Sequence, residues 1–309
     1  MQKKIAIIGG GLTGINTAKL LAEQELAELV IIDLPEKTRQ LQGHALDIMQ
    51  AAALNNKQAH ITVSANYKTI TGATIVIITA GVARSKKMSR EDVLKTNASL
   101  LKTIAPELLS YAPEATLIVL TNPVDIMTYA IYKYTGWPKE RLLGQAGILD
   151  TARFKHKIAS ILKCSPAAVQ GLVIGCHNDL MLPLVSHTTV QGKPLTELLT
   201  PEELKQVVLA TKQGGKHLID LLETSSAYYA PAAALTLMAE IVIKNLPHTI
   251  PASVYLTGEY GLSDLCLGVP VQLGAAGIKK IIELNLTTAE QQALSLSAAK
   301  VHKLLTTLP

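Results

Sequence analysis

Lys3-Lys4-Ile5-Ala6-Ile7-Ile8-Gly9-Gly10-Gly11-Leu12-Thr13-Gly14, near the start of the chain, is the segment that decides the fold. Its apolar first half predicts a buried strand, and residues 14–24 predict a helix. The G-x-G-x-x-G pattern between them is typical of a turn that binds a dinucleotide pyrophosphate. Gly9 would permit the tight turn, Gly11 the close approach of backbone to phosphate, and Gly14 close helix–strand packing. On its own the pattern is weak evidence, since glycine-rich turns also arise by chance.

An acidic residue stands where such a site requires one. Asp33 ends the next predicted strand, 19 residues after Gly14. A carboxylate there accepts hydrogen bonds from ribose hydroxyls and repels a 2′-phosphate, which favours NAD over NADP. The alternative is a turn or cap residue before Leu34-Pro35. Because strand, glycines and acid stand in one register, the sequence favours cofactor binding.

The first half of the chain alternates between predicted strands and helices. The strands are short, continuous apolar runs, which is typical of a parallel sheet covered on both faces. The sequence therefore predicts an α/β fold with an N-terminal Rossmann doubly wound parallel sheet. Strands are expected at residues 3–8, 29–33, 61–64, 74–79, 116–121 and 142–145, and helices most clearly at 14–24, 38–54 and 92–110.

From Asp150 onward the pattern changes to long helices and separated strands. This mixture predicts a C-terminal α+β catalytic domain at residues 147–309, after an NAD-binding Rossmann domain at 1–146. The expected elements are helices at 150–162, 201–222, 230–245 and 288–305, strands at 169–174, near 253–256 and near 269–273, and a hairpin around Gln191-Gly192-Lys193-Pro194.

The composition excludes several classes of protein. With 309 residues, 48% of them hydrophobic and 17% charged, the chain can form one large or two medium domains with sizeable cores. The net charge is +5, but the Lys and Arg residues are scattered, which argues against nucleic acid or a membrane as partner. No apolar run is long enough to predict a transmembrane helix, and Gly9-Gly10-Gly11 interrupts the one start that resembles a signal peptide. Three cysteines without metal-ligand or redox-pair spacing favour a reduced, cytoplasmic compartment.

The loop Ala80–Arg90 carries four basic residues and no acid until Glu91. It follows the predicted strand at 74–79, and Ser89 is expected to cap the helix after it. Most short charge runs are simply solvated. At the carboxyl end of a sheet strand, however, such a loop could deliver arginines to an anionic substrate.

Three more segments carry side chains that could take part in catalysis. Asn122 directly follows the predicted strand at 116–121, Asp150 and Arg153 share one face of a helix, and His177 follows the strand at 169–174. Singly, each has an ordinary explanation: a turn opener before Pro123, a surface ion pair, and turn chemistry. Taken singly, the ordinary explanation is favoured for each; a role in catalysis is favoured for all of them only beside a dinucleotide site and together with the resemblance described next.

Taken in order, these segments resemble the lactate/malate dehydrogenase family over essentially the whole chain. The resemblance rests on the glycine loop, Ile78-Thr79-Ala80-Gly81 with its arginine loop, Asn97, Thr121-Asn122-Pro123-Val124-Asp125, Leu149-Asp150-Thr151-Ala152-Arg153-Phe154, Gly175-x-His177-x-Asp179, Ser226-Ala227-Tyr228-Tyr229-Ala230-Pro231, and Gly258-Glu259-Tyr260-Gly261 with Gly268-Val269-Pro270.

The resemblance implies a role for each group. His177 would exchange a proton with the substrate hydroxyl while a hydride moves to or from a nicotinamide, and Asp150 would orient its imidazole. Arg153 would bind the C1 carboxylate of the substrate. Arg90 would polarise the reacting carbonyl, and Asn122 would orient it. The implied cofactor is NAD, bound by Gly9, Gly10, Gly11, Leu12, Thr13, Gly14, Asp33, Asn97, Leu120, Thr121 and Asn122.

Arg84 indicates the expected substrate. In the family, the third residue after the Ala-Gly pair sets specificity, and lactate enzymes carry glutamine there. A second guanidinium would stabilise a dicarboxylate, whereas pyruvate would leave it buried without a partner. Ala227 agrees, since lactate enzymes usually carry threonine at that position. The expected reaction is the NAD-dependent interconversion of (S)-malate and oxaloacetate.

Two alternatives stay open. One is another 2-hydroxy-acid dehydrogenase, chiefly for L-lactate, and the other is a non-catalytic NAD(H)-binding redox sensor on the same fold. The resemblance also implies a homodimer or homotetramer built on helices such as 38–54 and 201–222. The expected partner is a small dicarboxylate, with no nucleic acid, membrane or metal.

Overall fold

A computed structural model describes residues 3–82 and 89–308, and of Arg90 only the backbone. Six parallel strands run in the order β3-β2-β1-β4-β5-β6, the order of a dinucleotide-binding sheet. The α/β fold with a Rossmann sheet is therefore confirmed. The six strands are β1 Lys4–Ile8, β2 Glu28–Ile32, β3 Ile61–Ser64, β4 Ile75–Ile78, β5 Thr116–Val119 and β6 Leu142–Gly144.

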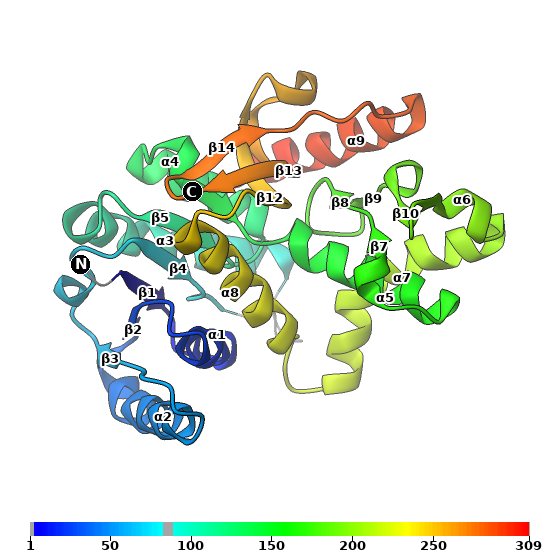
Figure 1. The fold of residues 1–309 in the computed structure, drawn as a ribbon. Coiled ribbons are helices and arrows are strands. Elements are labelled where there is room, and N and C mark those ends of the chain that lie inside the picture. Colours follow the sequence, from blue (N-terminus) through cyan, green and yellow to red (C-terminus); the bar gives the residue numbers. More distant parts are fainter. Residues whose placement is uncertain (1–2, 83–88, 309) are drawn as a thin grey trace.

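Helices cover this sheet on both faces (Figure 1). Every residue of the central strands β4 and β5 is buried, which explains why these strands are continuous apolar runs rather than alternating ones. The connecting helices are α1 Leu12–Glu23, α2 Pro35–Leu54, α3 Arg90–Tyr111 and α4 Val124–Thr135. The sequence did not predict α4. Its residues 124–131 are all buried, so the helix has no polar face to produce a 3.6-residue period.

The second half adds long helices and short strand pairs. Helix α8 of this half packs against α1 of the first half (Figure 1). The expected hairpin is present as β10 and β11, joined by Gln191 and Gly192, both with positive φ. The elements are α5 Gly147–Leu162, α6 Leu195–Leu198, α7 Pro201–Leu222, α8 Tyr229–Lys244, α9 Thr288–Leu305, and the strands β7 Val169–Gln170, β8 Val173–Ile174, β9 Leu182–Pro183, β10 Thr189–Val190 and β11 Lys193–Pro194.

Three late strands extend the first sheet rather than forming a separate one. Strand β12 pairs antiparallel with β6 through Ser253 and Gly144, and the hairpins β12–β13 and β13–β14 complete a nine-stranded sheet. The sequence predicted parts of β12 and β13 but missed β14. The division of the chain at residue 146 stays a prediction. The bounds are β12 Thr249–Thr257, β13 Ser263–Gly274 and β14 Gly277–Ile281, with 3₁₀ turns η1 Tyr67–Ile70, η2 Lys139–Arg141, η3 Pro166–Ala168, η4 Val185–His187 and η5 Glu259–Gly261.

Capping boxes fix the starts of three helices. The side chains of Ser89, Thr200 and Thr287 each accept a hydrogen bond from the backbone three residues on, and an acid there reaches back. The predicted cap at Ser89 is therefore confirmed, and α7 and α9 begin and end where the sequence predicted. None of the helices in the described ranges combines the length and apolar character needed to cross a membrane.

Candidate active site

The glycine loop leads from β1 into α1, and its glycines answer two different needs. Gly9 has φ +107°, and a Cβ on Gly14 would lie 2.0 Å from the Gly9 carbonyl oxygen, so the chain itself requires both glycines. Gly11 differs, because a Cβ there would meet nothing within 4 Å. Gly11 caps α1 in an extended conformation without a side-chain hydrogen bond, and the first turn holds no acid. The amides of this turn and the open space before them fit a pyrophosphate.

Asp33 lies beside this loop, immediately after β2. Its Oδ2 accepts a hydrogen bond of 2.7 Å from the backbone N–H of Gly10, and its Oδ1 one of 2.8 Å from that of Leu34. Lys37, one helical turn later, has its Nζ 3.6 Å from Oδ1. The loop and the acid that the sequence grouped together are thus in direct contact.

Asn97, on α3, joins the ends of β4 and β5. Its Oδ1 accepts from Val82 N at 2.7 Å, and its Nδ2 donates to Asn122 O at 2.7 Å. Close by, the hydroxyl of Thr121 donates to Ala80 O at 2.6 Å. Asn97 therefore holds backbone on both sides of the strand ends, a structural use that the sequence did not indicate. The exposed Asn122 precedes a cis bond to Pro123.

The reactive groups of the second half meet at one carboxylate. Asp150, in the first turn of α5, lies with its Oδ2 2.6 Å from Nδ1 of His177 and its Oδ1 3.0 Å from Nη1 of Arg153. Its side chain is only 2% exposed. Because Nδ1 is engaged, Nε2 is the imidazole nitrogen left for a substrate. Asp150 thus holds the candidate proton carrier and the candidate carboxylate binder at a fixed spacing.

The electrostatics of this cluster favour a protonated imidazole. Burial acts to lower the pKa of His177, but the charge and hydrogen bond of Asp150 together with the charge of Asp125 outweigh it, so this pKa lies above its usual value. The charge of Asp125 acts in the same direction as that of Asp150, and the charge of Arg153 opposes both. A raised pKa makes the protonated form of His177 more populated than in a free imidazole, which suits a group that gives and takes a proton.

Asp125 also belongs to this cluster, although the sequence analysis assigned it no role. It lies near the start of α4, is 5% exposed, accepts the backbone N–H of His177 at 2.9 Å and accepts the hydroxyl of Ser253 at 2.6 Å. Burial raises the pKa of Asp125, while the two donated hydrogen bonds act to lower it. The signal available beforehand was its place in the segment 121–125, three residues after Asn122.

Helix α9 forms hydrogen bonds to the turn that carries His177. Ser297 accepts the backbone N–H of Cys176 at 2.8 Å, and its hydroxyl donates to Cys176 Sγ at 3.0 Å. Asn178 accepts from Leu180 N at 2.7 Å, so its side chain closes the turn. Burial raises the pKa of Cys176 to about 12, which makes this thiol unreactive.

The predicted arginine loop is only partly described. Arg84 lies outside the described residues, and so does the side chain of Arg90, whose backbone begins α3. Asn97 fixes the described end of the loop through Val82. Arg153 is fully described, and among the described residues its buried Nε has no hydrogen-bond partner.

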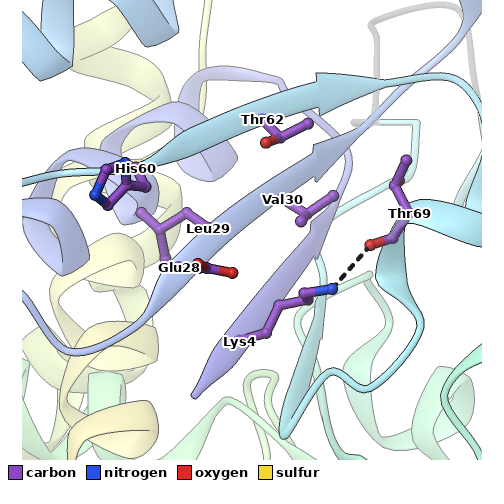
Figure 2. A pocket seen from close by; sticks show the side chains of 7 residues that line it. All are labelled: Lys4, Glu28, Leu29, Val30, His60, Thr62 and Thr69. Carbon is purple, nitrogen blue, oxygen red and sulfur yellow. Dashed lines mark hydrogen bonds between the residues drawn. The ribbon is translucent and has the colours of Figure 1, made fainter. Parts of the chain in front are cut away.

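A hollow at the opposite end of the sheet strands contains none of these groups. It lies at the amino ends of β1, β2 and β3, away from the carboxyl ends where open α/β sheets bind ligands. The ammonium of Lys4 is already held there by carbonyls of Thr69 and Thr71, at 3.4 and 2.8 Å. Figure 2 shows this hollow, lined by Lys4, Glu28, Leu29, Val30, His60, Thr62 and Thr69.

A dinucleotide loop at the ends of β1 and β2, with a His–Asp–Arg cluster formed by α5 and the turn after β8, defines a nicotinamide-dependent dehydrogenase. Two family profiles match the chain in agreement with this class. Residues 3–144 match the NAD-binding domain of lactate/malate dehydrogenase, and residues 148–308 match its alpha/beta C-terminal domain. The chain belongs to the lactate/malate dehydrogenase family. The predictions of the family and of NAD as cofactor are thereby confirmed.

Individual relatives cover the chain almost end to end. Malate dehydrogenase from Oceanobacillus iheyensis is 46% identical over 99% of this chain and 98% of its own, and that from Shouchella clausii is 43% identical over 100% and 98%. Among solved structures, malate dehydrogenase from Cryptosporidium parvum superposes with a TM-score of 0.96 at 35% identity, covering 100% of this chain and 99% of its own. Lactate dehydrogenase from the same organism, in complex with lactic acid and the dinucleotide, reaches 0.95 at 35%, covering 99% and 98%. The backbone alone therefore does not separate the two substrates.

Proposed function

We propose that this protein is an NAD-dependent malate dehydrogenase that interconverts (S)-malate and oxaloacetate, with His177 as general acid and base. The observation that carries the proposal is the buried Asp150 carboxylate shared between His177 and Arg153. Relatives that are 43–46% identical over the whole chain and are named malate dehydrogenases support the choice of substrate. Bound NAD supplies or accepts the hydride.

Arg153 is proposed to bind the C1 carboxylate of the substrate. One nitrogen of its guanidinium, Nη1, already donates a hydrogen bond to Asp150 at 3.0 Å. Its Nε is buried and, within the described residues, has no acceptor, which would be unfavourable unless a ligand provides one. A carboxylate with two oxygens suits a planar guanidinium.

His177 is proposed to move the proton. In reduction, Nε2 would give a proton to the carbonyl oxygen of oxaloacetate as the hydride arrives, and in oxidation it would take the proton of the malate hydroxyl. Asp150 holds Nδ1 at 2.6 Å, which fixes the ring and stabilises the protonated form. Asn122 and Arg90 are proposed to orient and polarise the same oxygen.

The choice of a dicarboxylate is proposed to rest on Arg84. Its guanidinium would pair with the second carboxylate of malate or oxaloacetate, and pyruvate would leave that charge without a partner. Lactate dehydrogenases whose backbones superpose closely on this chain support a choice of substrate made by a side chain rather than by the fold.

An NADH oxidation assay with oxaloacetate, with pyruvate and with no substrate tests the function. We expect rapid oxidation with oxaloacetate only, and Arg84→Gln should lower kcat/KM for oxaloacetate by roughly 100-fold or more while raising the relative rate with pyruvate. Preference for pyruvate in the unmodified protein would favour the lactate alternative. Oxidation with neither substrate would favour the redox sensor.

A homodimer or homotetramer in the cytoplasm is also proposed. Large apolar side chains are exposed on the two helices expected at an interface, among them Leu54 of α2 at 87% and Leu221 of α7 at 66%. The three cysteines are free, which suits a reducing compartment. A monomeric mass by light scattering would contradict the assembly.

A further inference from the structure

Helix α7 carries two consecutive glycines, Gly214 and Gly215, in the interior of its 22 residues. Glycine destabilises a helix interior relative to alanine, because it loses more backbone entropy on folding. Neither residue has a positive φ, so the backbone conformation does not require glycine. The neighbours of these two residues offer a reason for glycine here.

The side chain of Arg153 passes close to both glycines. A Cβ on Gly214 would lie 3.2 Å from Cδ, 3.7 Å from Nε and 3.8 Å from Cγ of Arg153. A Cβ on Gly215 would lie 3.6 Å from Nη1, 3.8 Å from Nη2 and 4.0 Å from Cζ of the same side chain. The two glycines therefore form a side-chain-free floor along which Arg153 lies from its stem to its guanidinium.

The guanidinium of Arg153 is also held by Asp150. Helix α5 packs against α7, and Asp150, one turn before Arg153 on α5, holds Nη1 at 3.0 Å. The guanidinium is thus held between a carboxylate and bare helix backbone, with its side chain 16% exposed. A shift at Cδ would move the guanidinium relative to Asp150 and hence relative to His177.

We propose that Gly214 and, to a smaller degree, Gly215 are positioning residues that set where Arg153 presents its guanidinium to the substrate carboxylate. The inference rests on the proposed function of Arg153 and deepens it. A contact of 3.2 Å requires Arg153 to give way by a few tenths of an ångström, whereas contacts of 3.6 Å and more are ordinary van der Waals distances. The two positions should therefore differ in their effect.

Three glycine-to-alanine variants in helix interiors make the test, because each gains the same helix propensity. They are Gly214→Ala, Gly215→Ala and, as the matched control, Gly43→Ala in α2, where a Cβ would meet no other atom of this chain within 4 Å. Because α2 and α7 are both proposed interface helices, the elution volume reports on assembly for all three variants. The measurements are KM for oxaloacetate, the dissociation constant of NADH, Tm, and elution volume in size-exclusion chromatography. Arg153→Lys is measured in parallel to test the role of Arg153 itself.

We expect Gly214→Ala to raise KM for oxaloacetate by roughly 3- to 10-fold, since a misplacement of about 1 Å costs on the order of 100-fold. Gly215→Ala should stay within about twofold and Gly43→Ala should not change KM, because their new methyl groups meet ordinary or no contacts. NADH affinity and elution volume should be unchanged in all three. Tm should rise by about 1–3 °C in Gly43→Ala and should not fall in Gly214→Ala.

The outcomes separate the inference from the proposed function. If Arg153→Lys raises KM and Gly214→Ala does not, the positioning role is overturned and the function of Arg153 stands. If neither raises KM, the assignment of Arg153 fails and the inference falls with it. A higher KM in Gly214→Ala accompanied by a lower Tm or weaker NADH binding would indicate general distortion and would also overturn it.

Discussion

The cofactor loop and the reaction cluster are built in opposite ways. The loop is six consecutive residues, Gly9–Gly14, within one strand–turn–helix unit. The cluster joins groups that are far apart in the chain: Asp150 and His177 are separated by 27 positions, Asp125 and His177 by 52, and Asp125 and Ser253 by 128. A local site depends on backbone conformation, whereas a dispersed site depends on how helices α4 and α5 and strand β12 pack together. Substitutions in the two regions should therefore impair different properties of the protein.

The largest expected effect is on the cluster, in His177→Ala. Removing the proton carrier should lower kcat by about 10³- to 10⁴-fold, near the upper range for general acid–base catalysis. The cofactor loop is a separate structure, so the dissociation constant of NADH should remain within about twofold. Stopped-flow kinetics and NADH fluorescence measure the two quantities. The exposed His44→Ala serves as control, and substantial residual turnover in His177→Ala would exclude the proposed proton transfer.

The next effect is on the loop, in Gly11→Ala. With open space at this position and φ of −70°, the folded chain accepts a methyl group without strain, so Tm should not fall. NADH should bind roughly tenfold more weakly, because the methyl group occupies the space that the pyrophosphate requires. Calorimetric titration with NADH gives the affinity.

Gly14→Ala is the contrasting variant for the same loop. Its Cβ would lie 2.0 Å from the Gly9 carbonyl oxygen, so Tm should fall as well. Unchanged NADH binding in Gly11→Ala would refute the placement of the cofactor.

The smallest effect concerns the charge that Asp125 places near His177. Asn is nearly isosteric and can still accept the His177 N–H, so Asp125→Asn removes mainly the charge. That charge raises the pKa of His177, alongside the larger effect of Asp150 and against that of Arg153. Without it the pKa falls, protonated His177 is lost at lower pH, and the decline of kcat/KM for oxaloacetate reduction with rising pH should begin earlier. At a pH above the midpoint we expect a loss of roughly threefold, the scale of a screened charge pair.

The control for Asp125→Asn is Ser253→Ala, which keeps the charge and the hydrogen bond to His177. Its pH–rate profile should match that of the unmodified protein, while stability falls by about 1 kcal/mol through the lost buried hydrogen bond. Identical profiles for Asp125→Asn and the unmodified protein would show that the carboxylate acts only as a hydrogen-bond acceptor.

Much of the fold was predictable because its signals are local. The continuous apolar runs predicted β1 to β6, and the predicted helices at 201–222 and 288–305 match α7 and α9 to the residue. Helix α4 was missed because it is buried nearly all round and shows no helical period. The joining of β12 to β6 was also missed, since one antiparallel pairing between Ser253 and Gly144 leaves no pattern in either strand.

The residues of the site were likewise predictable only where their signals are local. Residue types and spacing marked His177, Asp150 and Arg153 as candidates, and the resemblance to the family assigned a task to each. Asp125 and the Gly214–Gly215 floor were not predictable, because their importance lies in what approaches them from another element. Neither a buried acceptor nor an empty surface has a signature in its own stretch of chain.

The sequence by itself determined the parallel sheet, the dinucleotide turn and the family, since backbone conformation and apolar burial act over neighbouring residues. Only the tertiary structure decided that Asp150 is shared by His177 and Arg153, that Asp125 holds the backbone of His177, and that α7 is bare where Arg153 lies. These relations depend on distances between elements that the chain order does not encode, and packing at van der Waals contact fixes them to tenths of an ångström.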